Sequence, residues 1–369
     1  MVTLRITHLT SAHSRYDIRI YMKMARYIAL VNHQTTLIVA DGLGDELSEG
    51  VHIRDAGKST SRIDRIKNAP NRVLALAKSV PTDIYHFHDP ELLLIAKGLK
   101  ETGAKVIFDS HEDTVKQLLT KPYMTPFLCK MASKVFSVIE KSSLADLDLV
   151  IGATPTITEK FRQLNKSVTN INNFPIRDDL KTENIDWSQK ESVVCYVGGV
   201  SEIRGCYELA QSAALADQRF SLHVAGNVTD KIATQMYNTA PIGLHLLGMQ
   251  DRNQVRDLLA KSIAGIVTFL PVPNHVSAQP NKMFEYMSAG LPVIASDFAL
   301  WREIIDENKC GICVDPSNPS AIVAAIDYLI ENPKIAEQMG QNGLQAINTK
   351  YNWETEFKNL LDAYKALAI

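Results

Sequence analysis

Short runs of β-branched and apolar residues alternate along the chain with longer segments whose apolar positions recur at helical spacing. This alternation predicts βα units built around parallel sheets. In the first half, amphipathic segments predict helices at residues 18–31 and 91–100. The apolar runs of this half predict strands at residues 4–9, 35–39, 84–87, 105–108 and 149–153.

A polar stretch interrupts the pattern after residue 175, and a second strand–helix series follows it. We therefore expect an α/β protein of two Rossmann-like domains facing each other across a cleft, where ligands of such folds bind. The expected strands of the second series are 193–197, 221–225, 243–247, 264–269, 292–295 and 311–314. The expected parts are an N-terminal domain at 1–175, a linker at 176–191, a C-terminal domain at 192–350 and a one-sided helix at 351–369. That helix either closes the second domain or packs back on the first.

Composition and charge exclude several classes of protein. The chain has 369 residues and a net charge of −2, which argues against a nucleic-acid partner. No segment approaches the roughly 18 apolar residues of a membrane span, and the N-terminal residues lack the core of a signal peptide. We therefore expect a cytoplasmic protein with reduced cysteines, and we interpret Cys310 and Cys313 as core residues of a strand.

The charge is unevenly distributed between the two halves. Residues 1–175 carry 23 Lys and Arg against 18 Asp and Glu, a balance of +5, and the remainder carries 16 against 23, a balance of −7. A basic N-terminal half could face an anionic partner such as lipid head groups or a pyrophosphate. Ordinary variation in surface charge explains the counts equally well.

The segment 279–296 carries the strongest indication of a ligand site. Pro280 precedes a helix expected to begin near Asn281, and free amides at a helix start can bind anions. Lys282 adds a positive charge in the first turn, and the carboxylate of Glu285 can accept hydrogen bonds from vicinal hydroxyls such as those of ribose. A surface helix with a solvated glutamate explains the composition alone equally well.

A second element follows the strand expected at 193–197. Gly198 and Gly199 allow close approach of the backbone to a ligand, and Arg204 offers a planar fork suited to a pyrophosphate. The alternative is an ordinary surface arginine in a loop.

Three polar clusters follow strands in the first half, at residues 8–19, 85–91 and 108–113. Because the carboxyl ends of parallel strands meet at one edge of a sheet, we expect these side chains to line a site. The candidate binding residues are His13, Arg15, Asp17, Arg19, His88 and Asp89, and the candidate catalytic residues are His111 and Glu112. We interpret His86, between two apolar residues, as structural.

A metal site is the alternative interpretation of these clusters. The residues that could supply its ligands are His86, His88, Asp89, His111 and Asp113. Their spacing matches no established metal motif, so the prediction is that no metal is bound.

The segment 277–293 resembles the signature of family 4 retaining glycosyltransferases, which have the GT-B fold of two Rossmann domains. That signature is a Glu, seven residues, a second Glu, a small-residue helix and Gly-x-Pro-Val. Glu285 matches the second Glu, which holds the donor ribose in the family, whereas Ser277 replaces the first, which contacts the donor sugar. Gly199 stands where the family has Arg, and Arg204 where it has Lys.

The resemblance implies a set of donor-binding residues and an activity. The set is Gly198, Gly199, Arg204, Asn227, Gly248, Met249, Ser277, Asn281, Lys282, Met283, Phe284 and Glu285. The implied activity moves a sugar from a nucleotide-sugar donor, by family frequency a UDP-sugar, with retention of configuration and without a metal or cofactor. The implied acceptor is a saccharide or lipid-linked saccharide of bacterial surface polysaccharide, with His111 beside the transferred bond. The candidate binding residues of the first half are then the candidate acceptor-binding residues.

Two other functions fit parts of the pattern. A non-catalytic partner subunit of the same fold would explain the departures at Gly199 and Ser277. A sugar-nucleotide epimerase or an oxidoreductase could share the architecture, but the GxGxxG motif expected of an oxidoreductase is not present.

The stretch 116–141 interleaves apolar residues with five lysines. Such basic amphipathic segments can lie on anionic membranes, which would place the protein at the inner face of the cell membrane. The alternative is a helix whose apolar face lies in the core.

Overall fold

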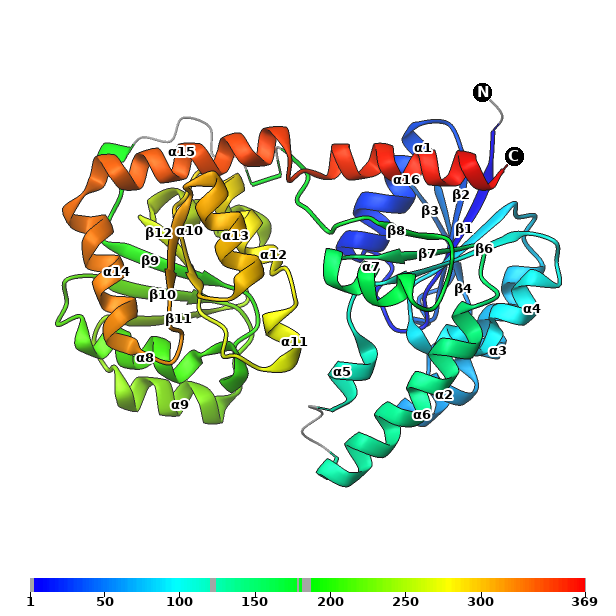
Figure 1. Cartoon of the computed structure of the whole chain (residues 1–369), viewed down its shortest axis with the longest axis horizontal. Coiled ribbons are helices and arrows are strands. Elements are labelled where there is room, and N and C mark those ends of the chain that lie inside the picture. The colour runs from blue at the N-terminus through cyan, green and yellow to red at the C-terminus, as the bar shows by residue number, and fades with distance from the viewer. Residues whose placement is uncertain (1–2, 120–123, 178, 181–186, 369) are drawn as a thin grey trace. The chain divides into compact units, whose positions relative to one another are not determined.

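The computed structural model describes residues 3–119, 124–177, 179–180 and 187–368, and these form two compact α/β units (Figure 1). Unit 1 comprises residues 1–173 together with 353–369, and unit 2 comprises 174–352. Of the predicted linker at 176–191, residues 178 and 181–186 lie outside the described residues. No helix within the described ranges is long and apolar enough to cross a membrane.

Unit 1 is built on a sheet of eight strands in the order β3-β4-β2-β1-β5-β6-β7-β8. All neighbours are parallel except β3 and β4, which are antiparallel. The strands are β1 Arg5–Leu9, β2 Gln34–Val39, β3 Glu46–Ser48, β4 Val51–Asp55, β5 Ile84–Phe87, β6 Lys105–Ser110, β7 Leu149–Gly152 and β8 Val168–Asn170. The five predicted strands are confirmed, whereas β3, β4 and β8 are additional.

Helices pack against this sheet (Figure 1). Apolar side chains of the strands and of the helices together form the core of the unit. They are η1 Ile18–Ala25, α1 Arg26–Leu30, α2 Arg62–Lys67, α3 Ala69–Lys78, η2 Pro90–Ile95, α4 Ala96–Lys100, α5 Thr114–Leu118, α6 Pro126–Leu144, α7 Pro155–Arg162 and α16 Trp353–Leu367. The first predicted helix is present as the π-helical η1 followed by α1, and the second as the 3₁₀-helical η2 followed by α4.

Helix α16 belongs to unit 1 although it follows unit 2 in the chain. Trp353 is fully buried, and its indole Nε1 donates to the backbone carbonyl of Lys23 at 3.0 Å. Glu356 accepts hydrogen bonds from the backbone and the side-chain amide of Asn172 at 2.9 and 3.0 Å. The helix therefore packs back on the first domain, one of the two arrangements that the sequence allowed.

Unit 2 has a fully parallel sheet of six strands in the order β11-β10-β9-β12-β13-β14. Its strands are β9 Val193–Val197, β10 Ser221–Ala225, β11 Leu244–Gly248, β12 Ala264–Val267, β13 Val293–Ser296 and β14 Gly311–Val314, each within a few residues of its prediction. Its helices are η3 Trp187–Gln189, η4 Glu202–Arg204, α8 Cys206–Leu215, α9 Asp230–Thr239, α10 Arg252–Lys261, α11 Pro273–Val276, α12 Asn281–Ser288, α13 Ala299–Asn308, α14 Pro319–Glu331 and α15 Pro333–Thr349. Cys310 and Cys313 are free thiols: Cys310 is buried in the core just before β14, and Cys313 lies on β14 and packs against the core partly buried.

Both sheets reverse their winding direction once, and this positions the candidate sites. In unit 1 the chain winds outward from β1 through β2 and then returns to the other side at β5. In unit 2 it winds outward from β9 through β10 and returns at β12. Ligands of doubly wound folds bind at such switch points, outside the carboxyl ends of the strands.

Replacing Trp353 by Ala should lower the free energy of unfolding of unit 1 by about 3–5 kcal/mol, because it empties a buried site between Tyr27 and Phe357. Urea denaturation followed by far-UV circular dichroism measures this as an earlier transition of unit 1. The control is Lys358→Ala, an exposed position on the same helix, which should change stability by less than about 0.5 kcal/mol. Identical unfolding of both variants would contradict the packing of α16 on unit 1.

Candidate functional site

A buried ion pair lies at the switch point of unit 1. Arg19, on η1, donates to both carboxylate oxygens of Asp109 on β6, at 2.8 and 2.7 Å, and also to the carbonyl of Ile171 at 2.8 Å. Both side chains are almost completely buried. Burial alone would raise the pKa of Asp109, but the charge of Arg19 and the neighbouring histidines hold it well below its usual range. The centre of the cluster is therefore an ionised carboxylate.

Asp109 holds two histidines that the sequence had singled out. Its Oδ2 lies 3.2 Å from Nδ1 of His88 and 3.3 Å from Nε2 of His111. The two imidazoles also approach each other, with His88 Nδ1 3.3 Å from His111 Nε2. The strand ends thus bring these candidates together around Asp109.

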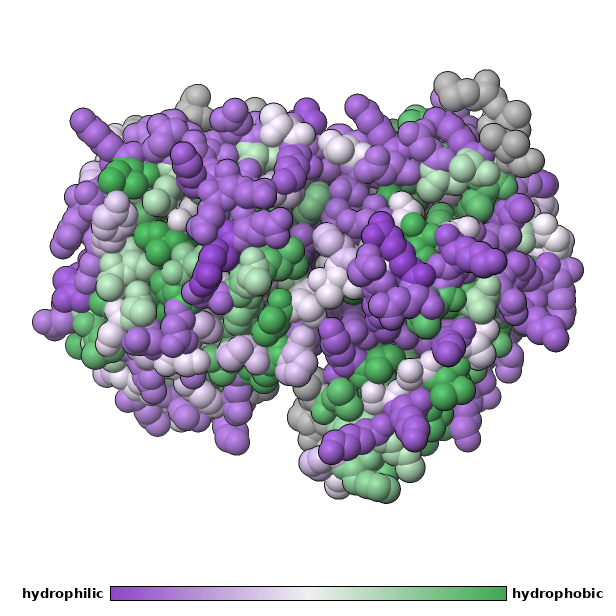
Figure 2. Space-filling view, in the orientation of Figure 1, coloured by the Kyte–Doolittle hydropathy of each residue, from purple (hydrophilic) through white to green (hydrophobic). Residues whose placement is uncertain are grey.

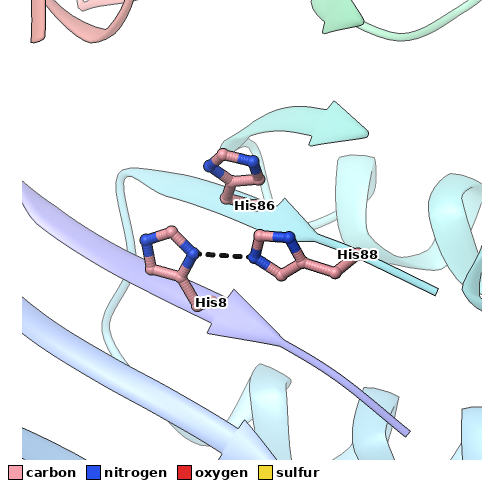
Figure 3. Close-up of side chains that lie close together, drawn as sticks. All are labelled: His8, His86 and His88. Atoms are coloured by element: carbon pink, nitrogen blue, oxygen red, sulfur yellow. Dashed lines mark hydrogen bonds between the residues drawn. The ribbon is translucent and has the colours of Figure 1, made fainter. Parts of the chain in front are cut away.

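Two further hydrogen bonds extend this cluster into the core, and Figure 3 shows the one between His8 and His88. His8 on β1 is hydrogen-bonded through Nδ1 to Nε2 of His88 at 2.9 Å, and His86 on β5 bonds through Nδ1 to the hydroxyl of Tyr364 on α16 at 2.7 Å. Burial lowers the pKa of His8 and His86 well below 6.5 and that of His88 to about 3, so all three are neutral at pH 7. His86 is thus a buried residue with a partner, in line with its structural interpretation.

These residues fit a divalent metal poorly. The groups His8, His86, His88 and His88, Asp109, His111 each place ligand atoms within 4.8 Å of one another. In the first group the rings are nearly parallel, at 10–30°, with His86 stacked on both others (Figure 3). A metal lies in the plane of each imidazole that binds it, so stacked rings do not direct their nitrogens at one point. In the second group Arg19 already neutralises the carboxylate.

The five residues of the alternative metal set do not converge. Asp113 caps α5 and accepts a hydrogen bond from Lys160 at 2.9 Å. Asp89 accepts hydrogen bonds from Thr10 and from backbone amides, and it pairs with His13 at 2.8 Å. Each carboxylate therefore has a partner other than the histidines of that set.

The pair of Asp89 and His13 places a charge at the edge of the cluster. Burial opposes protonation of His13, but the hydrogen bond and the charge of Asp89 outweigh it and raise the pKa of His13 to about 9. The same pairing outweighs burial at Asp89 and lowers its pKa. His13 is therefore an imidazolium at neutral pH.

A cavity of about 330 Å³ opens beside these side chains. His111 is partly exposed to it, at 21% of its side chain, whereas His88 is buried behind it. Glu112 also lines the cavity but hydrogen-bonds to Gln117. The other lining residues are Ala12, His13, Arg65, Asp89, Pro90, Glu91, Phe108, Ser110, Thr114 and Gln117.

Three of the candidate acceptor-binding residues are engaged within unit 1. Arg15 is bound by Asp41 and Glu46, each at 2.8 Å. Asp17 caps η1 by accepting from two of its backbone amides. Arg19 is the partner of Asp109 and is 3% exposed. These side chains hold the fold, and His13, His88 and Asp89 remain at the cavity.

In unit 2, three neighbouring strands are followed or ended by glycines that bring their loops together. Gly198 donates its amide to the carbonyl of Ala225 at 2.7 Å, and Gly226 donates to Gly248 at 2.7 Å. A Cβ on Gly226 would lie 2.0 Å from the carbonyl oxygen of Gly198, so only glycine allows this approach. Asn227, beside them, is exposed and accepts from the amide of Val200 at 3.0 Å.

Two cations lie beside this glycine cradle. The Lys282 ammonium is 5.3 Å from the ring centre of Tyr196 and 5.5 Å from that of Phe269, and Arg204 lies 5.5 Å from the same Phe269 ring. A Cβ on Gly198 would be 2.4 Å from Lys282 Nζ, which shows how closely the ammonium approaches the cradle. Arg204 also donates to the carbonyl of Gly199 at 2.9 Å.

The charges of Lys282 and Arg204 are not balanced by an ion pair in the part of the chain that the structure describes. Burial, followed by repulsion from Arg204, lowers the pKa of Lys282 to about 8. The arrangement is therefore suited to an anion.

Helix α12 begins at Asn281, as predicted, with Pro280 before it. Asn281 is exposed, whereas the side chains of Met283 and Phe284 are buried in the core. Of these two predicted donor-binding residues, only the backbone could contact a donor. Ser277, at the end of α11, donates its hydroxyl to the carbonyl of Pro273 at 3.3 Å.

Glu285, one turn into α12, is 21% exposed and accepts a hydrogen bond from Arg252 at 3.2 Å. Gly248 ends β11 at a positive φ of 68°, and the Met249 side chain after it is 75% exposed. The predicted donor residues thus share the carboxyl end of the unit 2 sheet.

Two residues of these sites were missed by sequence reasoning. Asp109 lies inside an apolar strand, and a charge at that position was the available signal for it. Arg252 carries no local signal, because its contact with Glu285 joins residues 33 positions apart.

Comparison with known proteins shows which proteins this chain is similar to. Residues 178–346 match the family Glycosyl transferases group 1. The chain is similar to sucrose-phosphate synthase from Thermosynechococcus elongatus, with a TM-score of 0.79, 17% identity and 99% of both chains covered. It is also similar to Anabaena Alr3699/HepE in complex with UDP-glucose, with a TM-score of 0.76, 13% identity and 98% and 100% coverage. The chain therefore has the GT-B fold, and the match of residues 178–346 to this family confirms the predicted resemblance.

Curated relatives point to the same class. The D-rhamnosyltransferase WbpZ of Pseudomonas aeruginosa is 22% identical over 274 residues, covering 70% of this chain and 66% of that protein. An uncharacterized glycosyltransferase of Methanocaldococcus jannaschii, MJ1178, is 24% identical over 173 residues, covering 47% and 48%. The chain thus spans between about half and two thirds of the length of these relatives.

Unit 1 should lose stability as the pH falls below about 6.5, the pKa of histidine in an unfolded chain. The folded pKa values of His8, His86 and His88 are lowered, so their contribution is fully present above pH 6.5 and is lost below it. Each such histidine contributes a slope of at most about 1.4 kcal/mol per pH unit. Urea midpoints measured at pH 7, 6 and 5 report the total slope.

A matched pair of variants isolates one histidine. His86→Gln keeps a polar partner for the Tyr364 hydroxyl and should reduce the acid slope of unit 1. His52→Gln, at an exposed position of β4, should leave that slope unchanged. Equal slopes in both variants would contradict the assignment of His86 as a neutral buried residue.

Proposed function

We propose that this protein is a glycosyltransferase that uses a nucleoside-diphosphate sugar, most readily a UDP-sugar. The observation that carries the proposal is the pair of cations, Lys282 and Arg204, without acidic partners among the described residues and beside the glycine cradle. A diphosphate would supply the missing negative charge, and the free amides at the start of α12 would add to its binding.

The rest of the donor fits around that diphosphate. Glu285 would accept hydrogen bonds from the ribose hydroxyls, and the loops at Asn227 and at Gly248–Met249 would hold the base. The UDP and UDP-glucose complexes of Alr3699/HepE, a protein of the same fold, support UDP as the nucleotide. Ser277 replaces the glutamate that contacts the sugar in the family, so the sugar would be selected by other contacts.

The proposed reaction displaces the nucleoside diphosphate from the anomeric carbon. Lys282 and Arg204 would stabilise the negative charge that develops on the departing phosphate, a role that requires no metal. His111, held by Asp109 and exposed to the unit 1 cavity, would lie beside the transferred bond. Retention of configuration, with the departing phosphate taking the acceptor proton, is the mechanism that the family resemblance implies.

The proposed acceptor is a saccharide or lipid-linked saccharide of surface polysaccharide, with His13, His88 and Asp89 near it. The similarity to a protein named as a D-rhamnosyltransferase supports a sugar-transferring role. A non-catalytic partner subunit would bind the nucleotide without turnover, and a sugar-nucleotide epimerase would convert the donor without releasing UDP. Release of UDP from a UDP-sugar in the presence of acceptor extracts separates the transferase from both.

Lys282→Ala should weaken donor binding by about 10- to 100-fold, because a charge-assisted contact to phosphate is lost. A thermal-shift panel of UDP, GDP and their sugars selects the nucleotide, and isothermal titration calorimetry then measures its affinity. The control is Lys334→Ala, which removes an exposed lysine from the first turn of α15 in the same unit. Wild-type affinity should also fall as the pH rises through about 8, where free Lys282 loses its proton.

Two outcomes would overturn this proposal. Unchanged donor affinity in Lys282→Ala would exclude the cation site as the diphosphate site. Absence of binding of every nucleotide in the panel to the folded wild-type protein would exclude the donor assignment altogether.

We also propose that α6 contacts an anionic membrane at the inner face of the cell membrane, in the cytoplasm. Its exposed apolar side chains lie on one stripe of the helix, at helical spacings of four, four and three residues. They are Phe127, Met131, Val135 and Val138, exposed by 72, 51, 57 and 66%. Figure 2 shows hydrophobic and hydrophilic side chains side by side over this helix.

The charges of α6 favour a lipid surface over a neutral protein partner. The exposed charged residues of the helix are all lysines, Lys130, Lys134 and Lys141. Its acidic residue, Glu140, is buried and paired with Lys160 at 2.7 Å. An apolar stripe beside a row of lysines matches the interface of anionic lipids. The remainder of the predicted membrane segment includes residues 120–123, which lie outside the described residues.

Replacing both Met131 and Val138 by Glu should reduce binding to anionic vesicles at least about tenfold, since it removes apolar area and adds repulsive charge. Co-sedimentation with phosphatidylglycerol-containing vesicles at low salt measures this, with phosphatidylcholine vesicles for comparison. The control is Leu215→Glu, which places the same charge at a 53% exposed position of unit 2. No binding of the wild type to anionic vesicles would end the proposal.

A further inference from the structure

Arg252 joins two carboxylates in unit 2. Its Nη1 donates to Oε1 of Glu285 at 3.2 Å, and its Nη2 donates to Asp179. Arg252 is the first residue of α10, and Asp251 caps that helix with a capping box completed by Gln254. The backbone from which the guanidinium extends is therefore fixed.

This contact uses one side of the Glu285 carboxylate. Within the described part of the chain, Oε2 of Glu285 has no hydrogen-bond partner, and the side chain remains 21% exposed. A planar guanidinium that is also held by Asp179 restricts the rotation of the carboxylate that it contacts. One oxygen is thus held while the other is free to accept from a ligand.

We propose that Arg252 is a positioning residue that holds Glu285 in the orientation in which it accepts hydrogen bonds from ribose hydroxyls. The inference rests on the proposed function and deepens it, because it names the residue on which recognition of the sugar part of the nucleotide depends. Arg252 follows the Gly248–Met249 loop by three residues, so the same turn of chain links the base-binding loop to Glu285.

A merely structural role for Arg252 makes a different prediction. If the only role of Arg252 were its ion pair with Asp179, loss of the arginine would lower the stability of unit 2 and leave recognition of the ribose unchanged. The test therefore needs a measurement that depends on the ribose hydroxyls and that stability does not affect.

The measurement compares the affinities of the wild type for UDP and 2′-deoxy-UDP, or for the guanosine pair if the nucleotide panel selects GDP. The wild type should prefer the ribonucleotide by about 10-fold or more, because a hydrogen bond to a charged group is lost with the hydroxyl. Arg252→Met should reduce this preference to about twofold or less. Glu285→Gln should also reduce the preference, by the same amount or by less. Arg252→Lys should restore part of the preference.

Arg256→Met is the matched control. Arg256 lies one turn further along α10 and donates to the backbone carbonyl of Asp179 at 3.3 Å and to Asn253. The Arg256→Met variant loses a side chain of the same type and a contact to Asp179, but it loses no contact to Glu285. It should keep the full preference for the ribonucleotide.

The outcomes separate this inference from the proposed function. Full preference for the ribonucleotide in folded Arg252→Met, with loss of preference in Glu285→Gln, would overturn the role of Arg252 alone. Equal affinity of the wild type for both nucleotides would also overturn it while leaving nucleotide binding intact. Failure of the wild type to bind any nucleotide would instead overturn the proposed function on which the inference rests.

Discussion

The ion pair between Arg19 and Asp109 is the interaction on which the polar centre of unit 1 depends. It is buried, and it joins η1 to the end of β6 and to the carbonyl of Ile171. Because it keeps the carboxylate ionised, His88 and His111 have a fixed acceptor and are held in place around it. Removing one partner of such a pair leaves an uncompensated buried charge, which costs about 3–5 kcal/mol.

The switch point of unit 2 has the opposite electrostatic design. In unit 1 each charge is balanced from within the fold, as Arg19 balances Asp109 and His13 balances Asp89. In unit 2 the cations Lys282 and Arg204 lie close together without an acidic partner among the described residues. A cluster that is complete in itself has little charge left to offer a ligand, whereas an unbalanced one attracts a counter-ion. This contrast supports the proposal that the donor anion binds to unit 2.

Local pattern was enough to predict most of the fold. Fully or almost fully buried strands made mainly of apolar residues, such as β5 and β9, fall on their predicted bounds. The short, partly exposed strands β3 and β8 carry no such run and were missed, because their place in the sheet comes from their neighbours.

The candidate sites were predictable to a smaller extent, because they depend on pairings between distant residues. Arg15 and Arg19 are of a residue type that often binds anionic ligands. In the structure, however, they form ion pairs with Asp41 and Asp109 within unit 1. The contact of Arg252 with Glu285 likewise arises only when α10 and α12 pack.

The position of α16 has a consequence for the order of folding during synthesis. Residues 174–352 leave the ribosome as one contiguous unit, whereas the first unit must wait for residues 353–367 to supply Trp353 and the Tyr364 hydroxyl bound to His86. Unit 1 is therefore completed after unit 2. Until α16 has been synthesised, His86 lacks its hydrogen-bond partner Tyr364.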